Sequence, residues 1–127
     1  MKKLLLAAAL AFAPMTALAA DWSGNWTINA AFDSMGVKFT TTCTLAQDAA
    51  GKLTGPCIGS AKETTAASGA VATGTDGKPS ISFGYDTTYE GTPVHLEYVG
   101  AAQADGSLAG TISTGGPQGT FTATRGK

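Results

Sequence analysis

Between residues 25 and 125 the sequence repeatedly alternates apolar and polar residues, and this alternation constrains the fold more than any other feature. A period of two puts successive side chains on opposite faces of a β-strand, whereas an amphipathic helix needs apolar residues three or four positions apart. Turns rich in Gly, Asp and Pro separate the alternating stretches. The pattern predicts eight strands, at Asn25–Phe32, Val37–Gln47, Lys52–Cys57, Ser68–Thr75, Pro79–Thr87, Thr92–Gln103, Ser107–Ser113 and Thr120–Arg125.

Directly opposed residues of an antiparallel hairpin share a face, so the apolar residues of neighbouring strands must face one another. The predicted strands meet this requirement if most of the short turns close hairpins, and only Ile58–Ala67 is a longer, unpatterned connection. The expected opposed pairs are Phe32–Val37, Ala30–Phe39, Trp26–Cys43, Cys43–Cys57, Val71–Phe83, Tyr85–Val94, Phe83–Leu96, Tyr98–Ile112 and Ile112–Phe121.

Sequential hairpins with a single apolar face describe an up-and-down meander, which either closes into a barrel or stacks as a sandwich. Closure removes the exposed edges of a long meander. Small residues at inward positions also suit the narrow interior of a closed barrel; these are Ala30, Gly55, Ala102, Gly110 and Ala123. We therefore expect an all-β protein, an eight-stranded antiparallel up-and-down barrel formed by residues 20–127.

The first nineteen residues have the three-part layout of a secretory signal peptide. Lys2 and Lys3 precede the apolar run Leu4–Phe12, and Ala17-Leu18-Ala19 provides the small residues that a signal peptidase accepts. The apolar run is about half of the ~20 residues that a membrane-spanning helix needs. The pattern predicts a periplasmic or secreted protein with no membrane span.

The chain has only two cysteines, Cys43 and Cys57. In an oxidising compartment such a pair indicates one disulfide, which would stabilise the fold by ~3 kcal/mol in the chain-entropy account. A metal site would need more ligands, and His95 is the only histidine. We therefore expect no metal site and no cofactor.

The charge pattern argues against nucleic-acid and anionic-lipid partners. The chain carries 8 basic and 9 acidic residues, with no basic run after the N-terminus. Proteins that bind nucleic acids need clustered positive charge to neutralise phosphates.

Few residues suit catalysis. The strand parity places His95 outward beside Glu97, and no serine lies in a nucleophile elbow. Asp86 and Glu90 flank a hairpin tip, where acidic residues commonly form turns, although a carboxylate pair or a weak calcium site is an alternative. We expect a protein that is not an enzyme.

Gly24-Asn25-Trp26 on the first strand and Arg125 on the last form the strongest local signature. In a closed barrel these strands are neighbours, and Arg125 has inward parity, so its guanidinium can cover the Trp26 ring as a plug. Gly24 lets the chain pass close to the ring. This arrangement resembles the calycin superfamily of lipocalins, fatty-acid-binding proteins, avidins and secreted bacterial metalloprotease inhibitors. Other stretches, such as Lys52-Leu53-Thr54-Gly55, are similar to small bacterial exported proteins.

Two kinds of function fit such a barrel, along with a filled barrel that serves only as an envelope component. The first is binding of a small apolar or amphipathic molecule, for which the expected wall residues are Phe32, Phe39, Phe83, Tyr85, Leu96, Tyr98 and Phe121. The alternative, implied by the resemblance, is a protein-binding module such as a periplasmic protease inhibitor.

Overall fold

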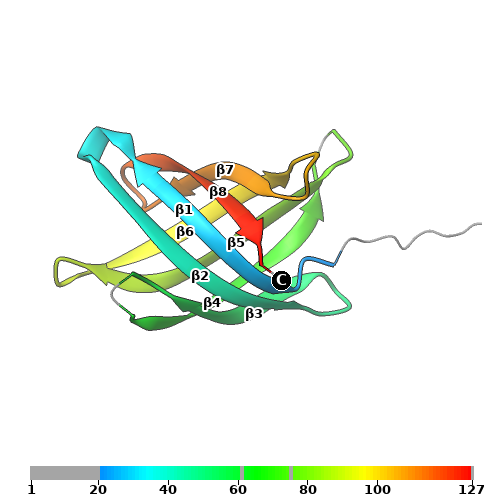
Figure 1. Cartoon of the computed structure of the whole chain (residues 1–127), viewed down its shortest axis with the longest axis horizontal. Helices are drawn as coiled ribbons and strands as arrows, with labels where there is room; N and C mark the ends of the chain where they lie inside the picture. Colours follow the sequence, from blue (N-terminus) through cyan, green and yellow to red (C-terminus); the bar gives the residue numbers. More distant parts are fainter. Residues whose placement is uncertain (1–20, 61, 75, 127) are drawn as a thin grey trace, which may run out of the picture.

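The chain folds into a closed barrel of eight antiparallel strands (Figure 1). The computed structural model describes residues 21–60, 62–74 and 76–126, so the predicted signal peptide lies outside the described residues. The strands are β1 Gly24–Phe32, β2 Val37–Gln47, β3 Lys52–Ile58, β4 Thr64–Thr73, β5 Pro79–Tyr89, β6 Thr92–Ala102, β7 Leu108–Ser113 and β8 Gln118–Arg125. A short 3₁₀ turn, Asp33–Met35, joins β1 to β2.

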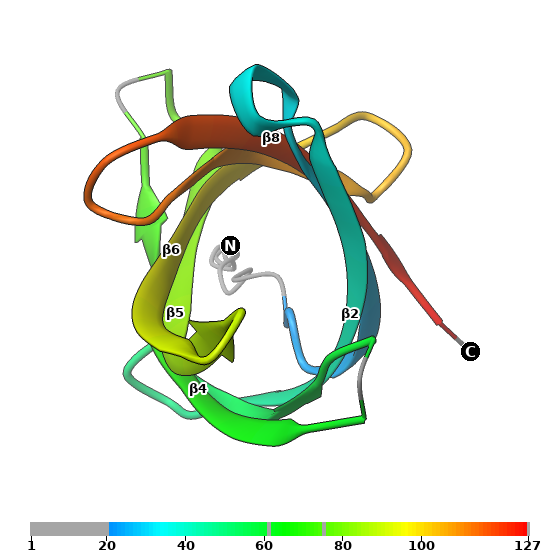
Figure 2. The same cartoon turned by 90° about the vertical axis from the view of Figure 1, so that its left-hand side faces the viewer.

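Each strand pairs with its sequential neighbours, and β1 pairs with β8 to close the ring that Figure 2 shows end-on. The closing register places Trp26 opposite Arg125 and Ala30 opposite Phe121. Every strand thus has a partner on both sides, which removes the sheet edges that an open meander would expose. The predicted fold class is confirmed, and the sandwich alternative is excluded.

The barrel interior is filled over most of its length by the inward residues of the alternating pattern. Ile28, Tyr98 and Ile112 have no exposed surface, and Phe83 is only 1% exposed. The Phe83 and Tyr98 rings stack with centroids 4.7 Å apart, and the Phe121 ring meets Tyr98 edge-on at 5.2 Å. These aromatic contacts make the middle of the barrel a solid core.

The predicted disulfide is present within this core. Cys43 on β2 and Cys57 on β3 are directly opposed, and their Cα atoms lie 4.0 Å apart. Both side chains are buried. The bridge therefore ties β2 to β3 from the inside of the barrel.

Five of the nine predicted opposed pairs are confirmed. The pairs Phe32–Val37, Ala30–Phe39, Trp26–Cys43, Cys43–Cys57 and Tyr98–Ile112 are opposed as expected.

The other four predicted pairs are wrong by two residues. Val71 opposes Ile81 instead of Phe83. Val94 opposes Thr87 instead of Tyr85, and Leu96 opposes Tyr85 instead of Phe83, which itself opposes Tyr98. Ile112 opposes Gly119 instead of Phe121. Two of the phenylalanines in the mispredicted pairs lie opposite glycines: Phe83 opposes Gly69 on β4, and Phe121 opposes Gly110 on β7. A Cβ atom at Gly69 would collide with the backbone of β5, so the close approach of these strands requires glycine.

Strand β4 begins four residues earlier than predicted, at Thr64. Thr64, Thr65 and Ala66 show no apolar alternation, yet they pair with Ile58, Cys57 and Pro56. The predicted long connection is therefore a compact turn, in which the Lys62 N–H donates to the Gly59 carbonyl at 2.9 Å.

Candidate functional site

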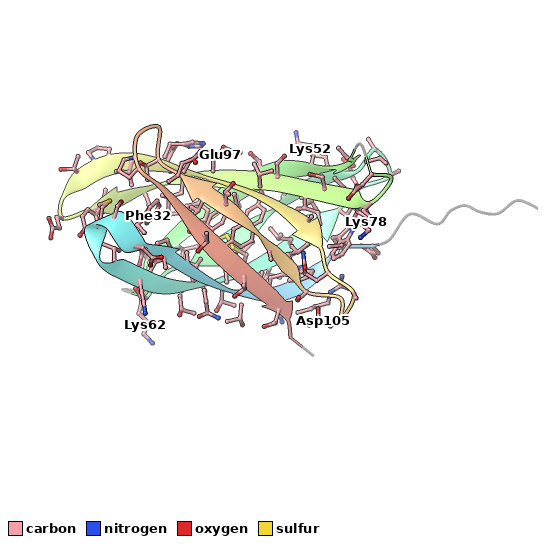
Figure 3. The ribbon with its side chains drawn as sticks, turned by 90° about the horizontal axis from the view of Figure 1, so that it is seen from above. Phe32, Lys52, Lys62, Lys78, Glu97 and Asp105 are labelled. Carbon is pink, nitrogen blue, oxygen red and sulfur yellow. A yellow bond between two sulfur atoms is a disulfide. The ribbon has the colours of Figure 1, made fainter. Side chains whose placement is uncertain are left out.

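One end of the barrel contains a cavity of about 360 Å³. It lies at the end formed by the β1–β2, β3–β4, β5–β6 and β7–β8 turns, where Figure 3 shows the labelled Phe32 and Lys62. We call this the open end. Large apolar side chains line much of the cavity, and two of them, Met35 and Tyr89, are themselves exposed. The apolar lining residues include Phe32, Met35, Val37, Phe39, Tyr85, Tyr89, Val94 and Leu96. Uncharged polar residues complete the lining, among them Thr41, Ser60, Thr65, Thr87, Thr88 and Thr114.

The opposite end, which we call the closed end, is filled by two tryptophans. Trp22 and Trp26 are buried, and their ring centroids lie 5.7 Å apart. The Trp26 indole N–H donates to the Trp22 carbonyl at 2.9 Å, and the Trp22 backbone N–H donates to the Gln47 side chain at 2.8 Å. The segment before β1 is thereby folded back into the barrel.

Arg125, the last residue of β8, covers these two indole rings. Its guanidinium carbon lies 4.8 Å from the Trp26 ring centroid and 5.5 Å from that of Trp22. The same guanidinium donates to the Asp21 carbonyl at 3.0 Å. Gly24, with φ of 134°, lies beneath the aliphatic part of the Arg125 side chain. The predicted plug residues thus lie together at the closed end, and Trp22 joins them.

A row of three hydroxyl groups lies at the floor of the cavity: those of Thr41 and Tyr85 line it, and that of Tyr98 lies directly beneath. The Tyr85 and Tyr98 hydroxyl oxygens are 2.6 Å apart, and the Tyr85 hydroxyl oxygen lies 3.4 Å from Thr41 Oγ1. Tyr85 lies on β5, Tyr98 on β6 and Thr41 on β2, so this row crosses the interior of the barrel. Burial raises the pKa of both tyrosines, which keeps the floor uncharged at neutral pH.

The predicted wall residues occupy two different levels. Phe32, Phe39, Tyr85 and Leu96 line the cavity. Phe83, Tyr98 and Phe121 do not line it; they are buried beneath its floor and pack on one another.

Several lining residues were not among the predicted wall residues. Thr41 and Val94 have the inward parity of their strands, so the alternation could have identified them. Met35 lies in the 3₁₀ turn, where parity carries no information, whereas Tyr89 is the last residue of β5, two residues beyond the predicted end of that strand, and shares the inward parity of Tyr85. Among the residues that the structure describes, the only charged ones that line the cavity are Lys38 and Glu63, which are exposed and therefore lie at the mouth rather than at the floor.

His95 lies outside the barrel, as its parity indicates, between two carboxylates. Its Nδ1 is 2.7 Å from Asp86 and its Nε2 is 2.7 Å from Glu97. The hydrogen bond with Asp86, followed by that with Glu97, raises the pKa of His95. Across residues 21–60, 62–74 and 76–126, no three His, Cys, Asp or Glu side chains are grouped suitably for a metal ion.

A second hollow of about 660 Å³ lies over β1, β2, β7 and β8. Exposed Asn29, Lys38, Thr40, Thr120 and Thr122 form much of its surface, so a ligand there would remain largely in water. No helix in the described part of the chain is both apolar and long enough to cross a bilayer.

Two mutants of the fluorescent protein UnaG have solved structures that are similar to this barrel. One aligns with a TM-score of 0.48 and 16% identity, over 84% of this chain and 96% of that chain. The other aligns with a TM-score of 0.47 and 16% identity, over 82% and 95%. No protein-family model and no curated protein matches the sequence. The function is therefore inferred from the side chains of this chain itself.

Proposed function

We propose that this protein is an exported carrier, periplasmic or secreted, that holds one small and mainly apolar molecule in the cavity at the open end. The observation that carries this proposal is the cavity of about 360 Å³ with apolar walls and a hydroxyl floor. Pockets for small molecules have volumes of about 300–1,000 Å³ and combine an apolar lining with a few polar groups. A cavity at the lower end of that range suits a molecule of one or two rings or a short chain.

The chemistry of the cavity supports binding rather than catalysis. The tyrosine hydroxyls of the floor stay protonated because burial raises their pKa, and a protonated phenol is a poor nucleophile. The only histidine lies on the outer face, with 55% of its side chain exposed. Export is supported by the signal-like residues 1–19.

The protease-inhibitor alternative has no observation in its favour. An inhibitor of that type needs an N-terminal segment that is free to enter a protease cleft. Trp22 is instead only 6% exposed, and its backbone is hydrogen-bonded to Gln47. Trp22 is therefore packed into the closed end of the barrel and is not part of a free N-terminal segment.

A matched pair of variants on β6 tests the proposal. Leu96→Trp adds bulk inside the cavity, whereas Val99→Trp adds the same side chain on the outer face, where Val99 is 47% exposed. Protein from the periplasm is first examined by native mass spectrometry for a retained molecule. Binding of the retained molecule, or of the apolar probe isopropylnaphthalene if none is found, is then measured for each variant. We expect Leu96→Trp to abolish binding and Val99→Trp to retain it; equal binding by both variants contradicts the proposal.

A further inference from the structure

The hydroxyl row at the cavity floor has more O–H groups than hydrogen bonds between its members. Thr41, Tyr85 and Tyr98 each carry one O–H group, and the row contains two contacts, of 2.6 Å and 3.4 Å. Each hydrogen bond uses one proton. At least one O–H group therefore has no acceptor within the row, and among the described residues no other hydrogen bond is donated by these three hydroxyls.

Burial determines where the free donor lies. Tyr98 is fully buried beneath the floor, and its hydroxyl is 2.6 Å from that of Tyr85. A buried donor without a partner is strongly disfavoured, so Tyr98 donates to Tyr85. The free O–H then belongs to Tyr85 or Thr41, and both of these residues line the cavity.

The floor offers this donor without any positive charge. In the described part of the chain, the charged residues that line the cavity are Lys38 and Glu63, and both are exposed at the mouth. A carboxylate moved to the floor would lose its hydration and find no cation there. An uncharged oxygen acceptor loses much less hydration and can take the free hydroxyl proton.

We propose that the cavity selects a neutral molecule whose buried end carries a carbonyl oxygen, such as a ketone, an ester or an amide, and whose remaining surface is apolar. The carbonyl oxygen accepts from Thr41 or Tyr85, while the apolar body contacts Phe32, Phe39 and Leu96. This inference rests on the proposed function and adds the chemical class of its ligand.

Three probes of one shape test the selection: acetylnaphthalene, isopropylnaphthalene and naphthoate. They place a ketone, a hydrocarbon and a carboxylate on the same ring system. With the full barrel at neutral pH, we expect the ketone to bind about tenfold more tightly than the hydrocarbon, the effect of one added hydrogen bond. We expect naphthoate to bind the most weakly of the three, and to bind more tightly as the pH falls and its carboxylate takes up a proton.

Variants of β2 assign the effect to the floor. Thr41→Val removes an inward hydroxyl, Thr42→Val removes the neighbouring outward one, and Thr41→Ser restores the inward hydroxyl. We expect the preference for the ketone to fall severalfold in Thr41→Val and to persist in Thr42→Val and Thr41→Ser. Tyr85→Phe gives a second, independent loss of the preference if Thr41→Val does not fold.

The outcomes separate the two proposals. If isopropylnaphthalene binds as tightly as the ketone, or naphthoate binds most tightly, the carbonyl selection is wrong while the cavity remains a binding site. An unchanged ketone preference in both Thr41→Val and Tyr85→Phe also overturns the selection. If none of the three probes binds, and Leu96→Trp and Val99→Trp behave alike with other apolar molecules, the proposed function itself is wrong.

Discussion

Both ends of the barrel are lined by aromatic pairs, but the two pairs have different surroundings. At the closed end, Trp22 and Trp26 pack at 5.7 Å beneath the Arg125 guanidinium, and both are buried. At the open end, the Phe32 and Phe39 rings lie 6.4 Å apart beside a cavity that the protein does not fill. Strand β1 contributes to both pairs, through Trp26 at one end and Phe32 at the other.

This difference in surroundings implies that the closed end contributes mainly to the stability of the barrel and the open end mainly to ligand binding. Aromatic surface at the closed end is covered by other side chains, so its burial contributes to the free energy of folding. At the open end Phe32 is also buried, but Phe39 is only partly buried, and its remaining surface is left for a ligand to cover. Substitutions at the closed end should therefore cost stability, and substitutions at the open end should cost affinity.

The largest effect on stability is expected for Trp26→Ala. Trp26 is 1% exposed, and truncating a buried aromatic residue costs about 3–5 kcal/mol of unfolding free energy. Phe39→Ala should cost less than half as much, because Phe39 is only partly buried. Urea denaturation measures both, and probe binding should weaken in Phe39→Ala but persist in folded Trp26→Ala. Equal losses of stability would mean that the two ends do not differ in this way.

The next largest effect is expected from removing the disulfide. The bridge closes a loop with a sequence separation of 14, for which the chain-entropy account gives ~3 kcal/mol. Cys43→Ala/Cys57→Ala should lower the midpoint of thermal unfolding by roughly 4–8 °C for each kcal/mol lost. Mass spectrometry before and after reduction shows whether the bridge forms in the exported protein, and free thiols in the oxidised sample would refute it.

A smaller effect is expected for Arg125→Ala. The guanidinium lies over two indole rings but is exposed, so the loss should be about 0.5–1 kcal/mol, with a red shift of the tryptophan fluorescence. Trp22→Phe simplifies the spectrum, and a double-mutant cycle with Trp26→Leu should show coupling because the residues are in contact. If the losses of stability in Arg125→Ala and Trp26→Leu simply add in the double variant, the guanidinium does not stabilise the plug through contact with the Trp26 ring. Probe affinity should stay the same.

The smallest effect concerns pH and the outer face. Hydrogen bonds from His95 to Asp86 and Glu97 raise the pKa of the folded-state histidine. A raised pKa stabilises the fold below the unfolded-state value of about 6.5, and this contribution is lost as pH rises through the folded-state pKa. The thermal midpoint of the native protein minus that of His95→Gln should therefore fall slightly between about pH 6 and about pH 8. A difference that rises over this range would contradict the assignment.

Strand parity predicted the inward or outward face of the strand residues, and the need to remove the sheet edges, together with small inward residues, favoured a barrel over a sandwich. Trp26, Cys43 and Phe83 all point inward as the alternation requires, and the disulfide follows from opposed positions in one hairpin. A shift of two residues preserves every face, so parity cannot detect it. The register errors at Phe83 and Phe121 arose because apolar residues were paired with one another, whereas the structure places each of these rings opposite a glycine.

The sequence pattern also could not predict how far along the barrel axis each inward residue lies, and therefore whether it lines the cavity or packs in the core. Phe83 and Tyr85 are two residues apart, about 7 Å along β5, and share one face. Phe83 nevertheless packs in the filled core while Tyr85 forms the floor of the cavity. The hydroxyl row depends on Thr41 meeting Tyr85 across the barrel, from strands that are not neighbours. No local pattern in the sequence encodes that contact.

The division between a binding end and a closed end can be tested directly by a nuclear magnetic resonance titration with acetylnaphthalene. The chain has two tryptophans, so the indole N–H signals of Trp22 and Trp26 report on the closed end, while the methyl groups of Leu96, Val94 and Thr41 report on the cavity. We expect saturable shifts of the three methyl signals and none of the indole signals. Shifts centred on the indoles, or on threonines of the outer face such as Thr42, would contradict it.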